Sequence, residues 1–419
     1  MKIIARILRH FIGLALAWLV VFVGMGEAQA QEGSLSQFNL AYQDATKVEL
    51  SQQWMFARHP TQPKGTYFVE WKSPTGQFDR FTFSYQWVGG YDTPLSPEFA
   101  PFPQDSMTIH WEEGRVIWEW EVNYPEDAPI MVVRAIHELS GNVYLFDMPA
   151  QHPGDFPGSD LVLREQTTDL PLFRRWVNVG DRVYPTSLYH PGDSIAYLYT
   201  YETDFDAALP PMATRSVNPG RTMEITSMQK VPLGEVLELG EQSLYLMQMD
   251  TNTLVGIGFW YYEQAYPKYN QAVTLLPPTT YISSRREQAS ILEAPDVKTA
   301  LDEFWLGAAL QVPNRARLAI RNYYRGITVV NERFGDYKAG WKTDMGMIMT
   351  LFGPPTVVTR TLDEERWIYQ QANGQRITFV FAKIKNIFTR QHYALRRQSV
   401  YNDIWLDQVD LWRKGLIEW

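Results

Sequence analysis

The sequence predicts a mainly β protein, with two consecutive β-sandwich (immunoglobulin-like) domains followed by a C-terminal α+β domain. Short segments of alternating polarity, separated by Gly, Pro, Asn and Asp, fill the first two thirds of the chain and indicate strands joined by turns. Aromatic residues make up 14% of the 419 residues, which suits thick sandwich cores. Beyond Pro295 the apolar residues recur at helical spacing instead.

The N-terminal residues have the parts of a secretory signal peptide. Basic residues precede an apolar run over residues 11–25, and small residues stand at Ala28 and Ala30. We therefore expect residues 1–30 to be removed, which leaves an exported protein in the periplasm or associated with the outer membrane. The alternative is an uncleaved membrane anchor, but the apolar run is shorter than the roughly 20 residues that span a bilayer.

Composition excludes several classes of protein. The sequence contains no cysteine, so disulfides, thiolate metal sites and the acylated cysteine of a lipoprotein are ruled out. The net charge of -9 argues against non-specific binding to nucleic acid or anionic lipid, which needs a basic patch to displace counterions. No segment after the leader is apolar enough to be an integral membrane span. We expect envelope proteins of unknown identity as partners.

The first sandwich is expected over residues 31–153. Its pattern is clearest at 116–122, where Val116, Trp118, Trp120 and Val122 share one face and glutamates lie on the other. A segment rich in Pro and Gly follows near residues 151–159 and could not continue a sheet. The expected strands are 65–72, 78–88, 107–111, 116–122 and 130–138.

The second sandwich is expected over residues 154–285. Its segments also alternate between apolar and polar residues, and Pro277-Pro278 follows the last of them. The cysteine pair of true immunoglobulin domains is absent. The expected strands are 194–201, 222–230, 243–249 and 253–262.

The α+β domain is expected over residues 286–419. Apolar residues recur at helical spacing from Val297 to Trp305 and from Leu318 to Phe334. A last amphipathic helix is expected to begin near Asn402 or Asp403. These spacings predict that the final third is largely helical.

The segment 345–352 admits two interpretations. Thr343 or Asp344 can cap a helix N-terminus, Gly353 can take the left-handed position at its end, and Pro354 can stop the turn. The alternative is a strand, because residues 347–352 have no polar face. We favour the helix.

The C-terminal part contains an ordered series of short motifs: Glu303-Phe304-Trp305, Asn331-Glu332-Arg333-Phe334, Gly340, Trp341, Thr343, Asp344, Gly353-Pro354-Pro355, Trp367-Ile368-Tyr369 and Ile377-Thr378-Phe379-Val380-Phe381. With this series the chain resembles the GWxTD domain family of exported proteins from Bacteroidota and related bacteria, over roughly residues 292–395. The resemblance implies β-sandwich segments ahead of the motif domain, and it carries over no enzyme mechanism. Met345 and Met347 depart from the family pattern, in which we expect arginines on either side of the glycine, so any carboxylate or phosphate role of those positions is in doubt here.

Six motif residues form the candidate binding site. Each also has a structural explanation: the tryptophan as core, the threonine and aspartate as helix cap, and Gly-Pro-Pro as helix stop. The six candidates are Trp341, Thr343, Asp344, Gly353, Pro354 and Pro355.

Patterns for catalysis or metal binding are weak. The seven histidines occur singly, without metal-ligand spacing and without an evident acidic partner. No G-x-S-x-G elbow marks a nucleophile, although sequence order leaves a Ser-His-Asp triad open. The stretch Gly340-Trp341-Lys342-Thr343 lacks the upstream glycine of a phosphate-binding loop. We expect no catalytic residue, metal or cofactor, while a catalytic site on an unfamiliar fold is left open.

Two functions of different classes fit these observations. The first is a non-catalytic exported scaffold or adaptor of the cell envelope that acts through protein–protein contacts, as in an outer-membrane or secretion-associated complex. The second is a polysaccharide-binding or polysaccharide-processing envelope protein. Trp118 and Trp120, or Tyr197, Tyr199 and Tyr201, could stack on sugar rings in that second case, or they could simply fill sandwich cores.

Overall fold

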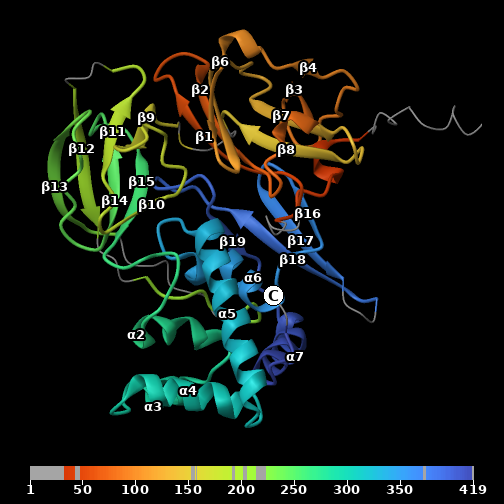
Figure 1. The fold of residues 1–419 in the computed structure, drawn as a ribbon, viewed down its shortest axis with the longest axis vertical. Helices are drawn as coiled ribbons and strands as arrows, with labels where there is room; N and C mark the ends of the chain where they lie inside the picture. Colours follow the sequence, from red (N-terminus) through yellow and green to blue (C-terminus); the bar gives the residue numbers. More distant parts are fainter. Residues whose placement is uncertain are drawn as a thin grey trace, which may run out of the picture.

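A computed structural model of the chain describes residues 33–42, 48–151, 156, 158–190, 194–201, 205–213, 223–370 and 374–417. The expected signal peptide and its cleavage site lie outside these residues. Two β domains lie at one end of the molecule, and a group of helices extends away from them (Figure 1). The predicted fold class is confirmed.

The first β domain is a sandwich of two four-stranded sheets. Their strand orders are β1-β2-β6-β5 and β4-β3-β7-β8. The alternation seen in the sequence turns one apolar face of each sheet inward, and these faces form a common core. Residues 78–80 form a 3-10 turn instead of starting a strand. The bounds are β1 (Ser51–Arg58), β2 (Lys64–Lys72), β3 (Phe81–Val88), β4 (Ala100–Pro101), β5 (Thr108–Glu112), β6 (Arg115–Asn123), β7 (Ile130–His137) and β8 (Val143–Pro149).

The second β domain pairs a five-stranded sheet with a two-stranded one. The larger sheet has the order β10-β15-β14-β12-β13, and β9 pairs with β11. Apolar side chains from both sheets form a separate core between them. All pairs are antiparallel except β10 with β15. The bounds are β9 (Leu161–Glu165), β10 (Trp176–Asn178), β11 (Val183–Ser187), β12 (Ile195–Tyr201), β13 (Ile225–Pro232), β14 (Ser243–Gln248) and β15 (Ile257–Tyr262).

The C-terminal region begins with helices whose starts follow ordinary capping rules. Asp296 accepts hydrogen bonds from two free amides at the start of one helix, and a Pro occupies the first turn of the longest helix. Ser284 and Glu287 form a reciprocal capping box. The bounds are α2 (Ala272–Leu275), α3 (Arg285–Leu292), α4 (Val297–Ala308), α5 (Pro313–Phe334), α6 (Asp344–Phe352) and α7 (Tyr401–Arg413).

The segment 344–352 is a helix, so the strand alternative is wrong. Thr343 caps α6 by accepting a hydrogen bond from the Gly346 amide at 2.9 Å. The helix has no polar face because seven consecutive residues, 345–351, are buried. At its other end, Gln408 and Trp412 of α7 both donate hydrogen bonds to the Leu351 carbonyl, which would otherwise lack a partner.

A four-stranded antiparallel sheet completes the C-terminal region, in the order β16-β17-β18-β19. The N-terminal residues of the described chain lie along its β16 edge: the Leu40 amide donates to the Val358 carbonyl at 2.9 Å, and Asn39 contacts the same strand. Thus residues at the start of the described chain cover an edge of the last sheet. The bounds are β16 (Val357–Arg360), β17 (Glu364–Gln370), β18 (Arg376–Lys383) and β19 (Tyr393–Leu395).

One continuous apolar core joins all three regions. It includes Ile130 and Val132 from the first sandwich, Leu244 and Trp260 from the second, and the residues between the C-terminal helices and sheet, such as Trp367. Because interior packing is dense, such a core leaves little freedom for one region to move against another. No helix in the described part of the chain is long and apolar enough to cross a membrane.

A charged network crosses the contact between the first sandwich and the C-terminal sheet. The Arg360 guanidinium lies 2.6 Å from an Asp147 oxygen and 2.8 Å from a Glu365 oxygen. Although burial opposes the charge of Arg360, the two carboxylates raise its pKa well above the ordinary value. Tyr91 and Trp367 donate further hydrogen bonds to these carboxylates. The network therefore fixes the position of the first sandwich relative to the C-terminal sheet, although the two are distant in sequence.

Candidate functional site

The GWKTD motif forms the turn between α5 and α6, and two glycines let this turn lie directly on α5. A β-carbon on Gly340 would stand 2.1 Å from the Val330 carbonyl oxygen, and one on Gly346 would stand 1.9 Å from the Gly340 carbonyl oxygen. No side chain larger than hydrogen fits at either position without moving backbone. The motif therefore requires glycine at these two positions, because neighbouring backbone segments lie too close for a β-carbon.

Trp341 is buried in this turn and is hydrogen-bonded through its backbone and its side chain. Its amide donates to the Asn331 side-chain oxygen at 3.1 Å, its indole N–H donates to the Tyr269 hydroxyl at 3.1 Å, and its carbonyl accepts from the Tyr281 hydroxyl at 2.8 Å. Asn331 is fully buried and also donates to the Pro267 carbonyl. Trp341 therefore binds the protein's own interior.

Burial keeps the surrounding phenols protonated. It raises the pKa of Tyr266 and Tyr281 well above the ordinary value and raises the pKa of Tyr269 to about 12. Neutral phenols can donate, and Tyr266 donates to the Asn331 carbonyl at 3.1 Å. Tyr266 and Tyr281 therefore act as structural hydrogen-bond donors around the motif, whereas the Tyr269 hydroxyl accepts from the Trp341 indole.

Asp344 forms an ion pair that ties α6 to the chain after β19. One of its carboxylate oxygens accepts from the Leu395 amide at 2.8 Å, and both contact the Arg397 guanidinium. Thr343, and not Asp344, is the helix cap. The carboxylate in the first turn of α6 also interacts favourably with the positive end of the helix dipole.

The motif also fastens a segment from the second β domain. The Ala208 amide donates to the Lys342 carbonyl at 3.0 Å, and the Lys342 ammonium donates to the Phe205 carbonyl. The Arg397 guanidinium donates to the Leu209 carbonyl at 3.0 Å. The turn that contains Trp341 and Asp344 is thus held to residues 205–209 by contacts within the chain.

The Gly-Pro-Pro part of the site ends α6. Gly353 has φ 72° and ψ -168°, an extended conformation with positive φ that is essentially restricted to glycine, in place of the left-handed helical one expected. Its carbonyl accepts from the Tyr369 hydroxyl at 2.9 Å. Pro354 is exposed and Pro355 is buried. Met345 and Met347 lie in the core, so neither presents a group to an anion.

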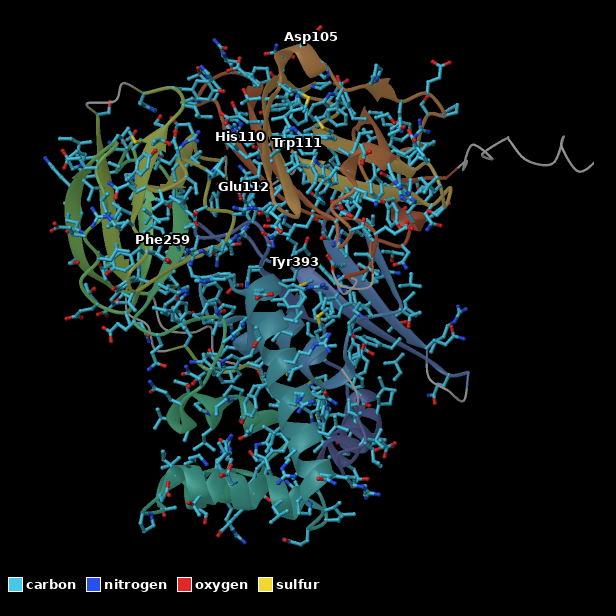
Figure 2. All side chains as sticks on the ribbon, in the orientation of Figure 1. Asp105, His110, Trp111, Glu112, Phe259 and Tyr393 are labelled. Carbon is cyan, nitrogen blue, oxygen red and sulfur yellow. The ribbon has the colours of Figure 1, made fainter. Side chains whose placement is uncertain are left out.

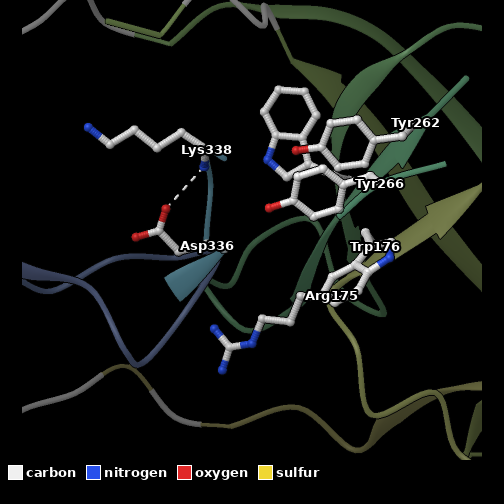
Figure 3. A pocket seen from close by; sticks show the side chains of 8 residues that line it. Arg175, Trp176, Tyr262, Tyr266, Asp336 and Lys338 are labelled. Atoms are coloured by element: carbon white, nitrogen blue, oxygen red, sulfur yellow. Dashed lines mark hydrogen bonds between the residues drawn. The ribbon is translucent and has the colours of Figure 1, made fainter. Parts of the chain in front are cut away.

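Next to the motif, a narrow crevice separates the second sandwich from the loop after α5. Arg175 and Asp336 both line it, and the Lys338 amide donates to Asp336 (Figure 3). Burial lowers the pKa of the Lys338 ammonium. Asp336 also lies 2.6 Å from a ring nitrogen of His392. The side chains leave no space for a water-sized sphere, so the crevice is closed in this conformation.

Three histidines lie beside carboxylates that are distant in the sequence, contrary to the expectation that none has an acidic partner. His137 is 3.5 Å from Glu49, His190 is 2.7 Å from Asp160, and His392 pairs with Asp336. Within the described residues, no three His, Asp or Glu side chains are placed to hold a metal ion.

Ser187, His190 and Asp160 form the one Ser-His-Asp grouping that the hydrogen bonds of the described residues contain. Both the serine and the aspartate contact the same ring nitrogen, Nδ1 of His190. A catalytic triad needs the serine on one ring nitrogen and the carboxylate on the other. The grouping therefore lacks the geometry that would activate the serine.

Trp118 and Trp120 do not form the exposed platform considered from the sequence. They are only 9% and 3% exposed and face Phe102, Tyr67 and Trp71 inside the first sandwich. The structural reason is the strand alternation itself, which turns the apolar face of β6 towards the opposite sheet.

Comparison with known proteins assigns the C-terminal region to a family. Residues 243–414 match the GWxTD domain, so the chain contains a GWxTD domain preceded by β-sandwich structure. The match begins in β14 and ends after α7, and is therefore wider at both ends than the range inferred from the motifs. No curated protein sequence matches the chain.

Among solved structures, the chain matches Dpr2 Ig1-Ig2 in complex with DIP-Theta Ig1-Ig3, at 12% identity over 50% of this chain and 97% of that chain, with a TM-score of 0.15. It also matches an I-band fragment of titin, at 9% identity over 52% of this chain and 88% of that chain, with a TM-score of 0.12. Similarity this low supports no functional argument. The sandwich assignment rests on the strand orders given above.

Proposed function

We propose that this protein is a non-catalytic, exported scaffold or adaptor of the cell envelope that acts through protein–protein contacts. The observation that carries the proposal is the continuous core that joins the two sandwiches to the GWxTD domain. Such a core fixes the relative positions of the outer surfaces, which a scaffold needs and a flexible string of domains lacks. The motif supports this rigidity by fastening residues 205–213.

The outer edge of β5 is the surface best suited to a protein partner. β5 pairs only with β6 among the described strands, and Trp111 on it is 66% exposed. Figure 2 shows Trp111 with His110 and Glu112 on this strand. Natural proteins usually protect such edges, and tryptophan is enriched among residues that dominate interface energies. An extended partner segment could therefore add to this sheet and pack on Trp111.

The test is a gentle-detergent pull-down of the tagged mature protein from its native envelope, with mass spectrometry of what co-purifies. Trp111→Ser is compared with Leu139→Ser, which removes an equally exposed apolar residue from the β7–β8 turn of the same domain. A stoichiometric envelope protein that is lost with Trp111→Ser alone is the expected result. Retention on peptidoglycan without a protein partner would overturn the proposal and favour the polysaccharide alternative.

A further inference from the structure

The first part of α5 is basic in an otherwise acidic protein. Between Phe304 and Asn331 the chain contains no acidic residue, while the net charge of the whole chain is -9. The four arginines of this stretch are all exposed. They are Arg315, Arg317, Arg321 and Arg325.

Three of these arginines form a ridge along α5. Arg317, Arg321 and Arg325 are spaced four residues apart, so they lie above one another on one side of the helix. The opposite side, which includes Ala319 and Tyr323, is buried in the core. The ridge therefore faces outward over about two turns of helix.

Exposed aliphatic side chains surround the start of this ridge. Leu310 is 60% exposed and Leu416 is 56% exposed, and Val312 and Leu318 are also exposed. The chain after α7 runs beside α5, because Asn322 donates to the Ile417 carbonyl at 2.9 Å and a β-carbon on Gly415 would stand 3.2 Å from the Arg315 carbonyl oxygen. Leu416 thus belongs to the same end of the helices as the α4–α5 turn.

The α4–α5 turn is strained in the way that functional turns often are. Leu310 and Gln311 have positive φ angles of 55° and 62°, a conformation that glycine or asparagine adopts at lower cost. The leucine side chain nonetheless points into solvent. This turn lies at the end of the helices remote from both sandwiches (Figure 1).

We propose that this helical end, formed by the α4–α5 turn, the arginine ridge of α5 and Leu416, binds an anionic membrane surface. The arginines would bind lipid phosphates, and the leucines and valine would enter the interfacial region of the bilayer. Long arginine side chains can reach phosphates while the aliphatic residues sit deeper. The β5 residues lie on the first sandwich, at the other end of the molecule from this helical end (Figure 2).

An acidic protein partner is the rival occupant, and the composition of the patch favours the membrane. Aromatic residues dominate protein interfaces, whereas leucine is under-represented at their energetic centres. The large exposed apolar residues of this patch are leucine and valine. Aliphatic side chains on a protruding turn, beside a row of arginines, match the chemistry of a phosphate-rich bilayer interface.

The test is co-sedimentation of the mature full chain with vesicles of phosphatidylglycerol and phosphatidylcholine in equal parts, and with vesicles of phosphatidylcholine alone. One variant carries Arg317→Gln, Arg321→Gln and Arg325→Gln. Its matched control removes the same charge from exposed positions outside the patch, at Arg182, Lys230 and Arg376, each replaced by Gln. A third variant, Leu310→Asn, suits the positive φ but removes the aliphatic side chain.

The expected result is binding to the anionic vesicles alone, weakened by salt. Each basic residue near an anionic surface contributes about 1 kcal/mol, or about fivefold in affinity, so the ridge variant should bind about a hundredfold more weakly. The control variant should lose far less, and Leu310→Asn should bind several-fold more weakly without a lower melting temperature. Absence of vesicle binding, or an equal loss in the control, would overturn the proposal. The proposed scaffold function stands or falls separately, on the Trp111 pull-down.

Discussion

Replacing Gly340 with alanine tests the argument that the motif exists to bring the α5–α6 turn onto α5. The new β-carbon would lie 2.1 Å from the Val330 carbonyl oxygen and 2.6 Å from the Asn331 α-carbon. Both obstacles are backbone atoms, so the turn itself has to move. That movement would lengthen the 3.1 Å hydrogen bond from the Trp341 amide to the Asn331 side chain and the contact between the Gly340 amide and the Tyr266 hydroxyl.

The magnitude follows from two terms. Overpacking costs roughly 1–3 kcal/mol, and each weakened buried hydrogen bond costs about 1 kcal/mol. We therefore expect Gly340→Ala to lower the free energy of unfolding by about 3–5 kcal/mol. Equilibrium urea unfolding, followed by tryptophan fluorescence, measures this change.

Gly307→Ala is the matched control. Gly307 is an exposed residue of α4, and a β-carbon there meets no atom within 4 Å. Because alanine is the better helix former by up to about 1 kcal/mol, this variant should be as stable as the wild type or more stable. If Gly340→Ala unfolded at the same urea concentration as the wild type, the close-approach explanation of the motif would be refuted.

Three further predictions concern stability. Thr343→Ala should lower the free energy of unfolding by about 1 kcal/mol through loss of the α6 cap. Thr343→Ser keeps the hydroxyl and should retain most of that stability. Equal urea midpoints for the two variants would contradict the capping role. Arg360→Met should lower the free energy of unfolding by about 3–5 kcal/mol in the same urea assay, because it leaves the Asp147 and Glu365 carboxylates buried without their counter-ion. Hydrogen bonds from Arg413 lower the pKa of Glu287 from its ordinary 4.5 to about 2, so this pair stabilises the fold above about pH 4.5 and its contribution is lost as the pH falls towards 2. The pair is partly exposed, which limits the effect to about 1 kcal/mol, and Glu287→Gln should flatten the pH dependence of thermal unfolding over that window.

Much of the local structure was predictable because it depends on neighbours in the sequence. Alternation identified β5, β6 and β7, and helical spacing identified α4 and α5. The sequence did not predict β1 (Ser51–Arg58), because two adjacent glutamines interrupt its apolar pattern. β10 has only three residues, which is too few to show alternation, whereas β9 does not alternate strictly and β11 contains Pro185, which argues against a strand.

The candidate site was predictable as a set of residues but not as a set of contacts. The motif residues, including Asn331, were visible in the sequence, which left the cap of α6 open between Thr343 and Asp344; the structure shows that it is Thr343. The partners of Asp344 were not visible, since the Leu395 amide and the Arg397 side chain lie far along the chain. No spacing rule connects such residues.

The sequence alone determined many of the segments that become strands and helices, and that Thr343 or Asp344 could start a helix that Gly353 would end. These features depend on backbone preferences and on side chains a few residues apart. Only the tertiary structure decided that Trp118 and Trp120 face inward and that Asp147 meets Arg360. It also decided that residues 39–41 cover the edge of β16. Those outcomes depend on how separate sheets and helices pack, because close packing and the pairing of buried charges act between segments that no local pattern links.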